Sequence, residues 1–173
     1  MSTTPARSSN KKMARMAGFW YLIVVVTGMF SLAYVPSQLI VWDDATTTFN
    51  NLLNEQWLFR LGIVSGLVCY TAFALLPLAL YRLLSPVHER AARLMVVLAL
   101  VSVPISFVNL LNKMAVLSLT SGEAYLGALP KEQLIAQVMF YLNQYDNGIL
   151  IVQIFWGLRS EEHTSELQSP LNI

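Results

Sequence analysis

The chain has 173 residues, of which 55% are hydrophobic and only 12% are charged, and its formal net charge is +1. A soluble domain carries about 25% charged residues, so this composition argues against a soluble protein. The single cysteine, Cys69, excludes an intrachain disulfide and a cysteine metal cluster. The composition therefore indicates a protein whose solvent is the lipid bilayer.

Four apolar segments are each long enough to cross a membrane as a helix, which takes about 20 mostly apolar residues. They cover residues 16–35, 58–84, 91–119 and 135–158, the last with a polar interruption. Continuous apolar runs do not fit the alternating pattern of a transmembrane barrel strand. We therefore predict an all-α integral membrane bundle over residues 16–158, with four transmembrane helices.

Residues 1–15 precede the first segment and are rich in polar and basic side chains. We predict that they form a disordered cytoplasmic tail. A cleaved signal peptide is the alternative for the first segment, but the apolar part of a signal peptide normally has about 7 to 15 residues. The longer run at 16–35 favours a retained membrane anchor.

Basic residues lie on one side of the predicted membrane. The loop 36–57 has no lysine or arginine, whereas basic side chains precede the first segment and flank the loop 85–90: Arg7, Lys11, Lys12, Arg15, Arg82, Arg90 and Arg93. Because basic loops remain in the cytoplasm, we predict a multi-pass protein of the cell (inner) membrane with a cytoplasmic N-terminus.

Residues 159–173 differ abruptly in composition from the apolar segment before them. The string from Arg159 to Ser169 closely resembles one reading frame of a widely used sequencing adapter. We expect residues 159–173 to be a non-native tail and the natural protein to be longer. The alternative is a genuine solvated tail on the cytoplasmic side.

The third segment carries a polar stripe. Its members are spaced at i, i+4, i+7 and i+11, which places them on one helical face: Ser102, Ser106, Asn109 and Lys113. An ionisable side chain within a span costs at least a few kcal/mol against lipid and marks a functional site by default. The alternative is that Lys113 extends its amine to the nearby membrane interface.

The fourth segment contains a polar block in which Asn143, Asp146 and Asn147 share a face. Counting inward at about 1.5 Å per residue brings Lys113 and Asp146 to a similar depth. We predict that these two residues form a charge pair in a polar pocket with Asn109 and Asn143. The alternative is a helix that enters the membrane only near Asn147 and leaves the block in water.

Between the first two spans, a short amphipathic helix is predicted over residues 45–56. Asp44 is its expected N-cap, and Phe49, Leu52 and Leu53 form its apolar face. We expect this helix to lie on the membrane surface, with a lid over an outward-facing pocket as the alternative.

The second span contains Gly62 and Gly66, a pair of small residues that lets another helix approach closely. The pair predicts either close packing within the chain or a contact with a partner helix.

No catalytic motif is present in the sequence. It lacks a phosphate-binding glycine loop, a nucleophile elbow and a zinc-protease motif, and His88 falls in a polar turn. The basic residues follow topology and form no nucleic-acid footprint. We therefore expect no cofactor, metal or nucleic acid, and a lipid bilayer as the main partner.

The ordered features resemble a family of bacterial multi-pass membrane proteins, domain of unknown function 4386. The resemblance covers roughly residues 14–158 and rests on residues 15–22, Pro36, Asp44, Thr48, Asn51, Phe59, Arg60, Gly62, 80–84, Pro86, Val87, Tyr125, Leu126 and 155–158.

The resemblance implies about six spans in the complete protein and assigns no activity. Asp44, Asn51 and Arg60 match polar positions of the family. They either build a site near the outer face or join the short helix to the second span.

Two functions remain open from the sequence. The first is a non-enzymatic structural, interaction or sensor component of the membrane. The alternative is a permease-like or small-ligand-binding bundle that uses the polar faces of the third and fourth spans.

Overall fold

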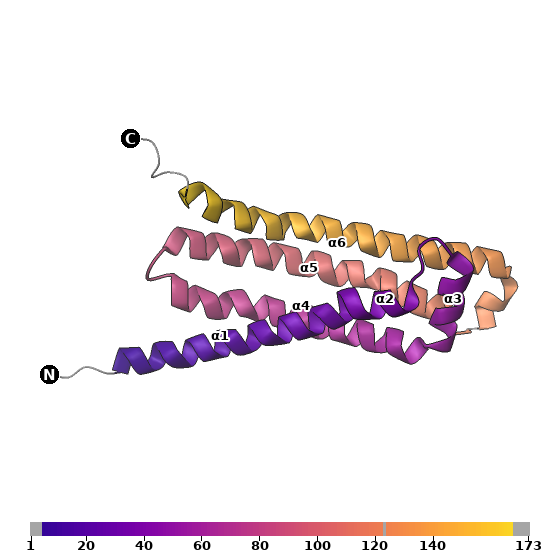
Figure 1. Ribbon diagram of the computed structural model, residues 1–173, viewed down its shortest axis with the longest axis horizontal. Coiled ribbons are helices and arrows are strands. Elements are labelled where there is room, and N and C mark those ends of the chain that lie inside the picture. Colours follow the sequence, from indigo (N-terminus) through magenta and orange to yellow (C-terminus); the bar gives the residue numbers. More distant parts are fainter. Residues whose placement is uncertain (1–4, 123, 168–173) are drawn as a thin grey trace.

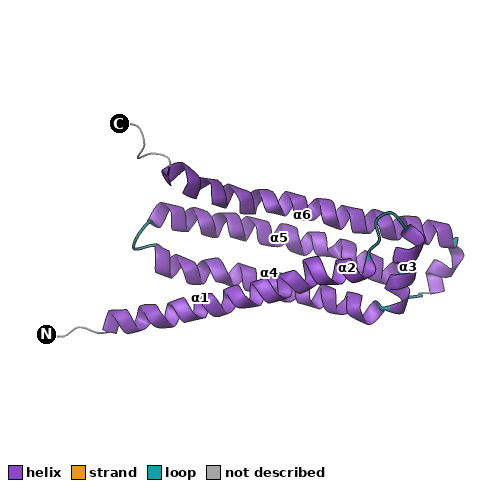
Figure 2. Ribbon diagram, viewed as in Figure 1, coloured by secondary structure: helices purple, strands orange, loops and turns teal. Residues whose placement is uncertain are grey.

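The computed structural model describes residues 5–122 and 124–167, and every regular element in these ranges is a helix (Figure 2). In chain order the elements are α1 (Pro5–Met29), the π-helix η1 (Phe30–Tyr34), α2 (Val35–Leu39), α3 (Ala45–Asn54), α4 (Gln56–Leu84), α5 (Glu89–Leu119), the 3₁₀ helix η2 (Ala124–Ala128) and α6 (Lys131–Leu167).

Four long helices lie side by side in alternating directions (Figure 1). Helix α1 packs on α4, α4 on α5, and α5 on α6. The short α4–α5 turn lies at one end of the bundle, and α3 and η2 lie at the other. Short loops between successive long helices make them antiparallel neighbours.

Three helical stretches in the described part of the chain are long and apolar enough to cross a membrane: Lys11–Leu39, Gln56–Leu84 and Glu89–Leu119. They contain the first three predicted spans. The first of these stretches joins most of α1 to η1 and α2.

Both ends of the bundle extend further as helix than the sequence suggested. Helix α1 begins at Pro5, so the prediction of a disordered segment is wrong for residues 5–15. Proline is well suited to the first turn of a helix, and the Lys, Arg, Met and Ala residues that follow are good helix formers. Helix α6 continues to Leu167, which makes residues 159–167 helical. Residues 1–4 and 168–173 lie outside the described residues, and the non-native origin of 159–173 stays a prediction.

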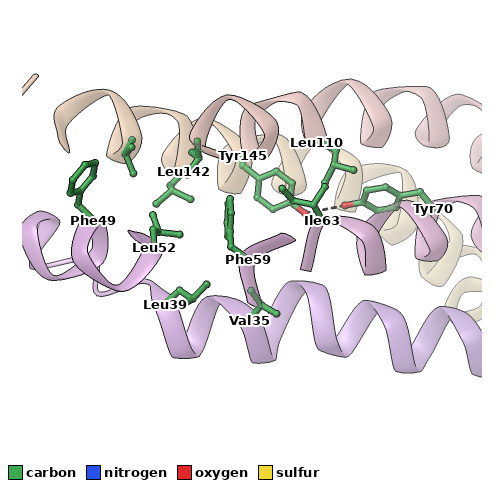
Figure 3. Close-up of a cluster of buried hydrophobic side chains, with 12 residues drawn as sticks. Val35, Leu39, Phe49, Leu52, Phe59, Ile63, Tyr70, Leu110, Leu142 and Tyr145 are labelled. Carbon is green, nitrogen blue, oxygen red and sulfur yellow. Dashed lines mark hydrogen bonds between the residues drawn. The ribbon is translucent and has the colours of Figure 1, made fainter. Parts of the chain in front are cut away.

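The main core lies beside α3 (Figure 3), where Val35, Leu39, Phe49, Leu52 and Phe59 are all buried. The short helix and its Asp44 cap are confirmed: the Asp44 carboxylate accepts the backbone N–H of Thr47 at 2.9 Å. The apolar face of α3 covers the end of the bundle.

Helix α4 approaches η1 and α2 at Gly62 and Gly66. A Cβ atom at Gly62 would lie 2.9 Å from Cγ1 of Val35, and one at Gly66 would lie 3.1 Å from Oγ of Ser31. The structure therefore uses this pair for close packing within the chain, the first of the two predicted possibilities. A contact of these glycines with a partner helix stays a prediction.

Candidate functional site

The polar stripe of α5 faces the inside of the bundle. Ser102, Ser106 and Asn109 are buried, and Lys113 is only 2% exposed. The two serine hydroxyls donate to carbonyl groups of their own helix. Lys113 therefore has to find its partners on neighbouring helices, and the interfacial alternative for this lysine is not what the structure shows.

The partner of Lys113 is a carbonyl group that the first span leaves without its usual donor. In an α-helix the carbonyl of Ser31 would accept the N–H of Val35. In η1 this N–H bonds instead to the carbonyl of Phe30, five residues earlier. The next residue, Pro36, has no N–H. The local sequence thus creates a buried carbonyl at Ser31 that needs a donor from elsewhere.

Lys113 supplies that donor. Its Nζ atom donates to the carbonyl oxygen of Ser31 at 3.2 Å, and the same atom lies 4.2 Å from the centroid of the Tyr145 ring. A cation over an aromatic face gains about 2 kcal/mol where water is excluded. The lysine thus joins the first span, α5 and α6 at one point.

The predicted charge pair of Lys113 with Asp146 does not form in the structure. The ion pair found within the described residues joins Arg93 to Glu89, on the exposed surface of α5. Tyr145, the residue before Asp146, meets the lysine instead. The predicted depth was right, but one residue is about 100° around a helix, so Asp146 points elsewhere.

Tyr145 connects the lysine to two further polar groups. Its hydroxyl lies 3.1 Å from the hydroxyl of Tyr70 on α4 (Figure 3). Its backbone carbonyl accepts the side-chain amide of Asn109 at 2.8 Å, and Asn112 donates to the Asn109 side-chain oxygen at 3.0 Å. We call Ser31, Tyr70, Asn109, Lys113 and Tyr145 the central polar network.

Helices α5 and α6 come together closely at Asn109. A Cβ atom at Gly148 would overlap the side-chain amide of Asn109. Only glycine leaves room for this amide to reach the backbone of α6. Gly148 is therefore part of the structural basis of the central polar network.

The four residues of the predicted pocket are divided between two surfaces. Asn109 and Lys113 are buried in the bundle, whereas Asn143 and Asp146 are exposed on α6. The side-chain oxygen of Asn143 accepts the amide of Asn147 one turn away, at 3.5 Å. The structure thus contains a polar interior and a separate polar outer face, in place of one pocket.

The predicted outer-face residues also serve different purposes. Asp44 caps α3, and its hydrogen bonds from the hydroxyl and backbone N–H of Thr47 hold the pKa of its carboxyl below the ordinary value. Asn51 donates to the carbonyl of Leu39 at 3.3 Å, which joins α3 to α2. Arg60 is exposed on α4. The hydrogen bonds of Asp44 and Asn51 fasten the short helix at the end of the bundle.

Two partners in the network were not singled out from the sequence. Ser31 carries a signal only in retrospect, because a proline five residues later removes a donor. Tyr70 lies 14 residues from each end of α4, and a tyrosine at that depth requires a hydrogen-bond partner when buried.

A separate hollow between α1 and α4 is apolar and open to the surface, and is lined by Trp20, Ile23, Leu67, Val68, Thr71 and Ala72. It does not include the central polar network. No group of three or more His, Cys, Asp or Glu residues in the described ranges is placed to hold a metal ion.

These features define the class of protein: an all-helical membrane protein with helices able to span the bilayer and a polar network buried among them. The chain belongs to the family described as Domain of unknown function (DUF4386), whose model matches residues 16–160. Neither a curated protein nor a solved structure matches the chain.

Proposed function

We propose that this protein is a non-enzymatic interaction or sensor component of the cell (inner) membrane, with four transmembrane helices and a cytoplasmic N-terminus. The observation that carries the proposal is the burial of Lys113 with its amine already engaged by Ser31 and Tyr145. A catalytic or substrate-binding amine needs room for a reacting group beside it. Here protein atoms occupy its surroundings.

The assignment of α6 as the fourth span draws support from its register. Tyr145 on α6 contacts Tyr70 at the centre of α4. Val138, Leu142 and Val152 are buried against the bundle on either side of this contact. A helix that pairs with a spanning helix at its midpoint, and packs above and below that point, crosses the same layer.

The orientation draws support from the arrangement of the loops. The α4–α5 turn, flanked by Arg82 and Arg90, lies at the end of the bundle opposite α3. The loops at the α3 end carry Asp43 and Asp44 and lack the basic excess. This charge difference favours a cytoplasmic α4–α5 turn and an outward-facing α3.

A permease-like function is the second candidate, because Asn143, Asp146 and Asn147 are exposed on α6. Polar side chains at membrane depth face water or protein. A permease path along the polar stripe of α5 would make its residues reachable from water, whereas the central polar network as observed excludes water.

Cysteine labelling separates the two functions. Ser106→Cys in a Cys69→Ser background is expected to resist a small water-soluble thiol reagent in native membranes and to react after unfolding in detergent. Val87→Cys, in the exposed α4–α5 turn, is the matched reactive control. Rapid labelling of Ser106→Cys in the folded protein would support the permease and contradict the proposal.

The same background tests the orientation. Asp43→Cys is expected to react with a membrane-impermeant reagent added to intact cells, and Val87→Cys only after permeabilisation. The reverse pattern would place the N-terminus outside.

A further inference from the structure

The exposed face of α6 is apolar at both ends and polar in the middle. Four consecutive or near-consecutive polar residues are exposed: Asn143, Gln144, Asp146 and Asn147. On the same side of the helix, Phe140 is exposed before them, and Leu150, Ile151 and Ile154 after them. We call residues 143, 144, 146 and 147 the polar belt. This sequence of side chains is that of a helix surrounded by hydrocarbon with a local interruption.

The depth of the polar belt follows from contacts on the opposite side of α6. Tyr145 lies within the belt along the chain and contacts Tyr70, which lies 14 residues from either end of α4. Asn109, near the middle of α5, bonds to the Tyr145 carbonyl. The belt is therefore level with the middle of two helices that are long and apolar enough to span the membrane.

A carboxylate and three amides cannot face lipid at that depth without a large free-energy cost. A central Asp costs about 3 kcal/mol on insertion scales, and such residues almost always face protein or a water-filled cavity. No ion pair with Asp146 is formed within the described residues, and Lys113 is bonded on the inner side of the bundle. The belt requires a partner from outside this set of helices.

We propose that the polar belt of α6 is a docking surface for a transmembrane helix that carries a lysine or arginine at mid-membrane. The proposal rests on the proposed role of α6 as a span. Charge complementarity selects the partner: the belt has one carboxylate, amides that both donate and accept, and no basic residue. A basic side chain among these acceptors neutralises Asp146 and is itself stabilised.

A second copy of the chain fits the belt less well. Two copies meeting at this face would place two Asp146 carboxylates near each other in a medium of low dielectric constant, where like charges repel strongly. The amide groups alone would gain only about 0.6 kcal/mol each on average. A heterologous partner with a cation avoids this repulsion.

The test measures binding of three synthetic peptides to the full chain in phosphatidylcholine vesicles by energy transfer. Each peptide has about 20 Leu and Ala residues and carries Lys, Glu or Leu at its centre. The acceptor dye is attached at Val87→Cys in the Cys69→Ser background. The central-Lys peptide is expected to bind about ten-fold more tightly than the central-Leu peptide, the size of a strong interhelical polar contact.

Two variants connect the effect to the polar belt. Asp146→Asn is expected to remove the preference for lysine, whereas Asp43→Asn, the same change in the exposed outer loop, is expected to retain it. Equal binding of the Lys and Leu peptides, or a lysine preference that survives Asp146→Asn, overturns the proposal.

Two further measurements identify how the proposal fails. Asp146-dependent energy transfer between two differently labelled copies would assign the belt to self-association and overturn the basic partner. Labelling of Asn147→Cys by an impermeant reagent in sealed vesicles would place the belt in water, which overturns both the docking surface and the span assignment of α6. Protection of Asn147→Cys without a peptide preference overturns the docking surface alone.

Discussion

Lys113 on α5 donates a hydrogen bond to the carbonyl of Ser31, 82 positions earlier in the chain, at 3.2 Å. This carbonyl needs the lysine because Val35 bonds to Phe30 and Pro36 has no N–H. A backbone defect in one transmembrane helix is therefore corrected by a side chain of another, which couples their positions.

Replacing Lys113 by Met tests this coupling. The variant leaves the buried Ser31 carbonyl without a donor, and we expect a loss of about 1–3 kcal/mol in unfolding free energy, measured in lipid bicelles. Pro36→Ala restores an N–H to the first span, so Lys113→Met should cost clearly less in that background. An equal cost in both backgrounds would show that the lysine does not serve this carbonyl.

Gly148→Ala is expected to destabilise the protein by about 1–3 kcal/mol, because the new methyl group overlaps the side-chain amide of Asn109. Gly18→Ala is the matched control, since nothing lies within 4 Å of the added atom. Alanine is the better helix former, so this control should be neutral or slightly stabilising. Similar losses for both variants would contradict the close α5–α6 contact.

The hydroxyl pair of Tyr70 and Tyr145 is open to a double-mutant cycle with phenylalanine. Each single change leaves one buried hydroxyl without this partner. We expect a coupling free energy of about 0.5–1.5 kcal/mol, the range of hydrogen bonds inside membranes. Additive single and double variants would show that the two hydroxyls do not interact.

The Asp44 cap predicts a pH dependence at the end of α3. Because Thr47 lowers the pKa of Asp44 in the folded protein, the cap stabilises the helix fully above the unfolded-state pKa. This stabilisation is lost as the pH falls through the lower folded-state pKa. Hydrogen exchange of the Thr47 amide should accelerate over that acidic range relative to its intrinsic rate. Asp44→Asn retains a capping oxygen and should abolish this dependence; an unchanged profile would contradict the cap.

The sequence predicted the arrangement of helices better than it predicted their contacts. Length and apolar composition were sufficient for the first three spans, and i, i+4 spacing for the buried stripe that ends at Lys113. The depth of Lys113 relative to the fourth segment was also correct. Each of these properties depends on one helix or on counting along two.

The error lay in the rotation of α6 about its axis. Sequence reasoning paired Lys113 with the opposite charge at Asp146, whereas the structure presents the ring of the preceding Tyr145. Which side of a helix meets its neighbour depends on packing, here on the space that Gly148 leaves for Asn109. The donor requirement at Ser31 was missed because it arises from a π-helix, which the apolar pattern of the first span does not indicate.

The π-helix η1 also determines how the first span tolerates changes in length. A π-helix accommodates one more residue per turn than the surrounding α-helix would. Deleting a residue within Phe30–Tyr34 therefore allows a regular α-helix with Val35 and Leu39 still directed into the core. A deletion earlier in α1 would instead rotate everything before it by about 100° relative to the core. Homologous chains with a first span one residue shorter would be expected to have lost that residue at η1.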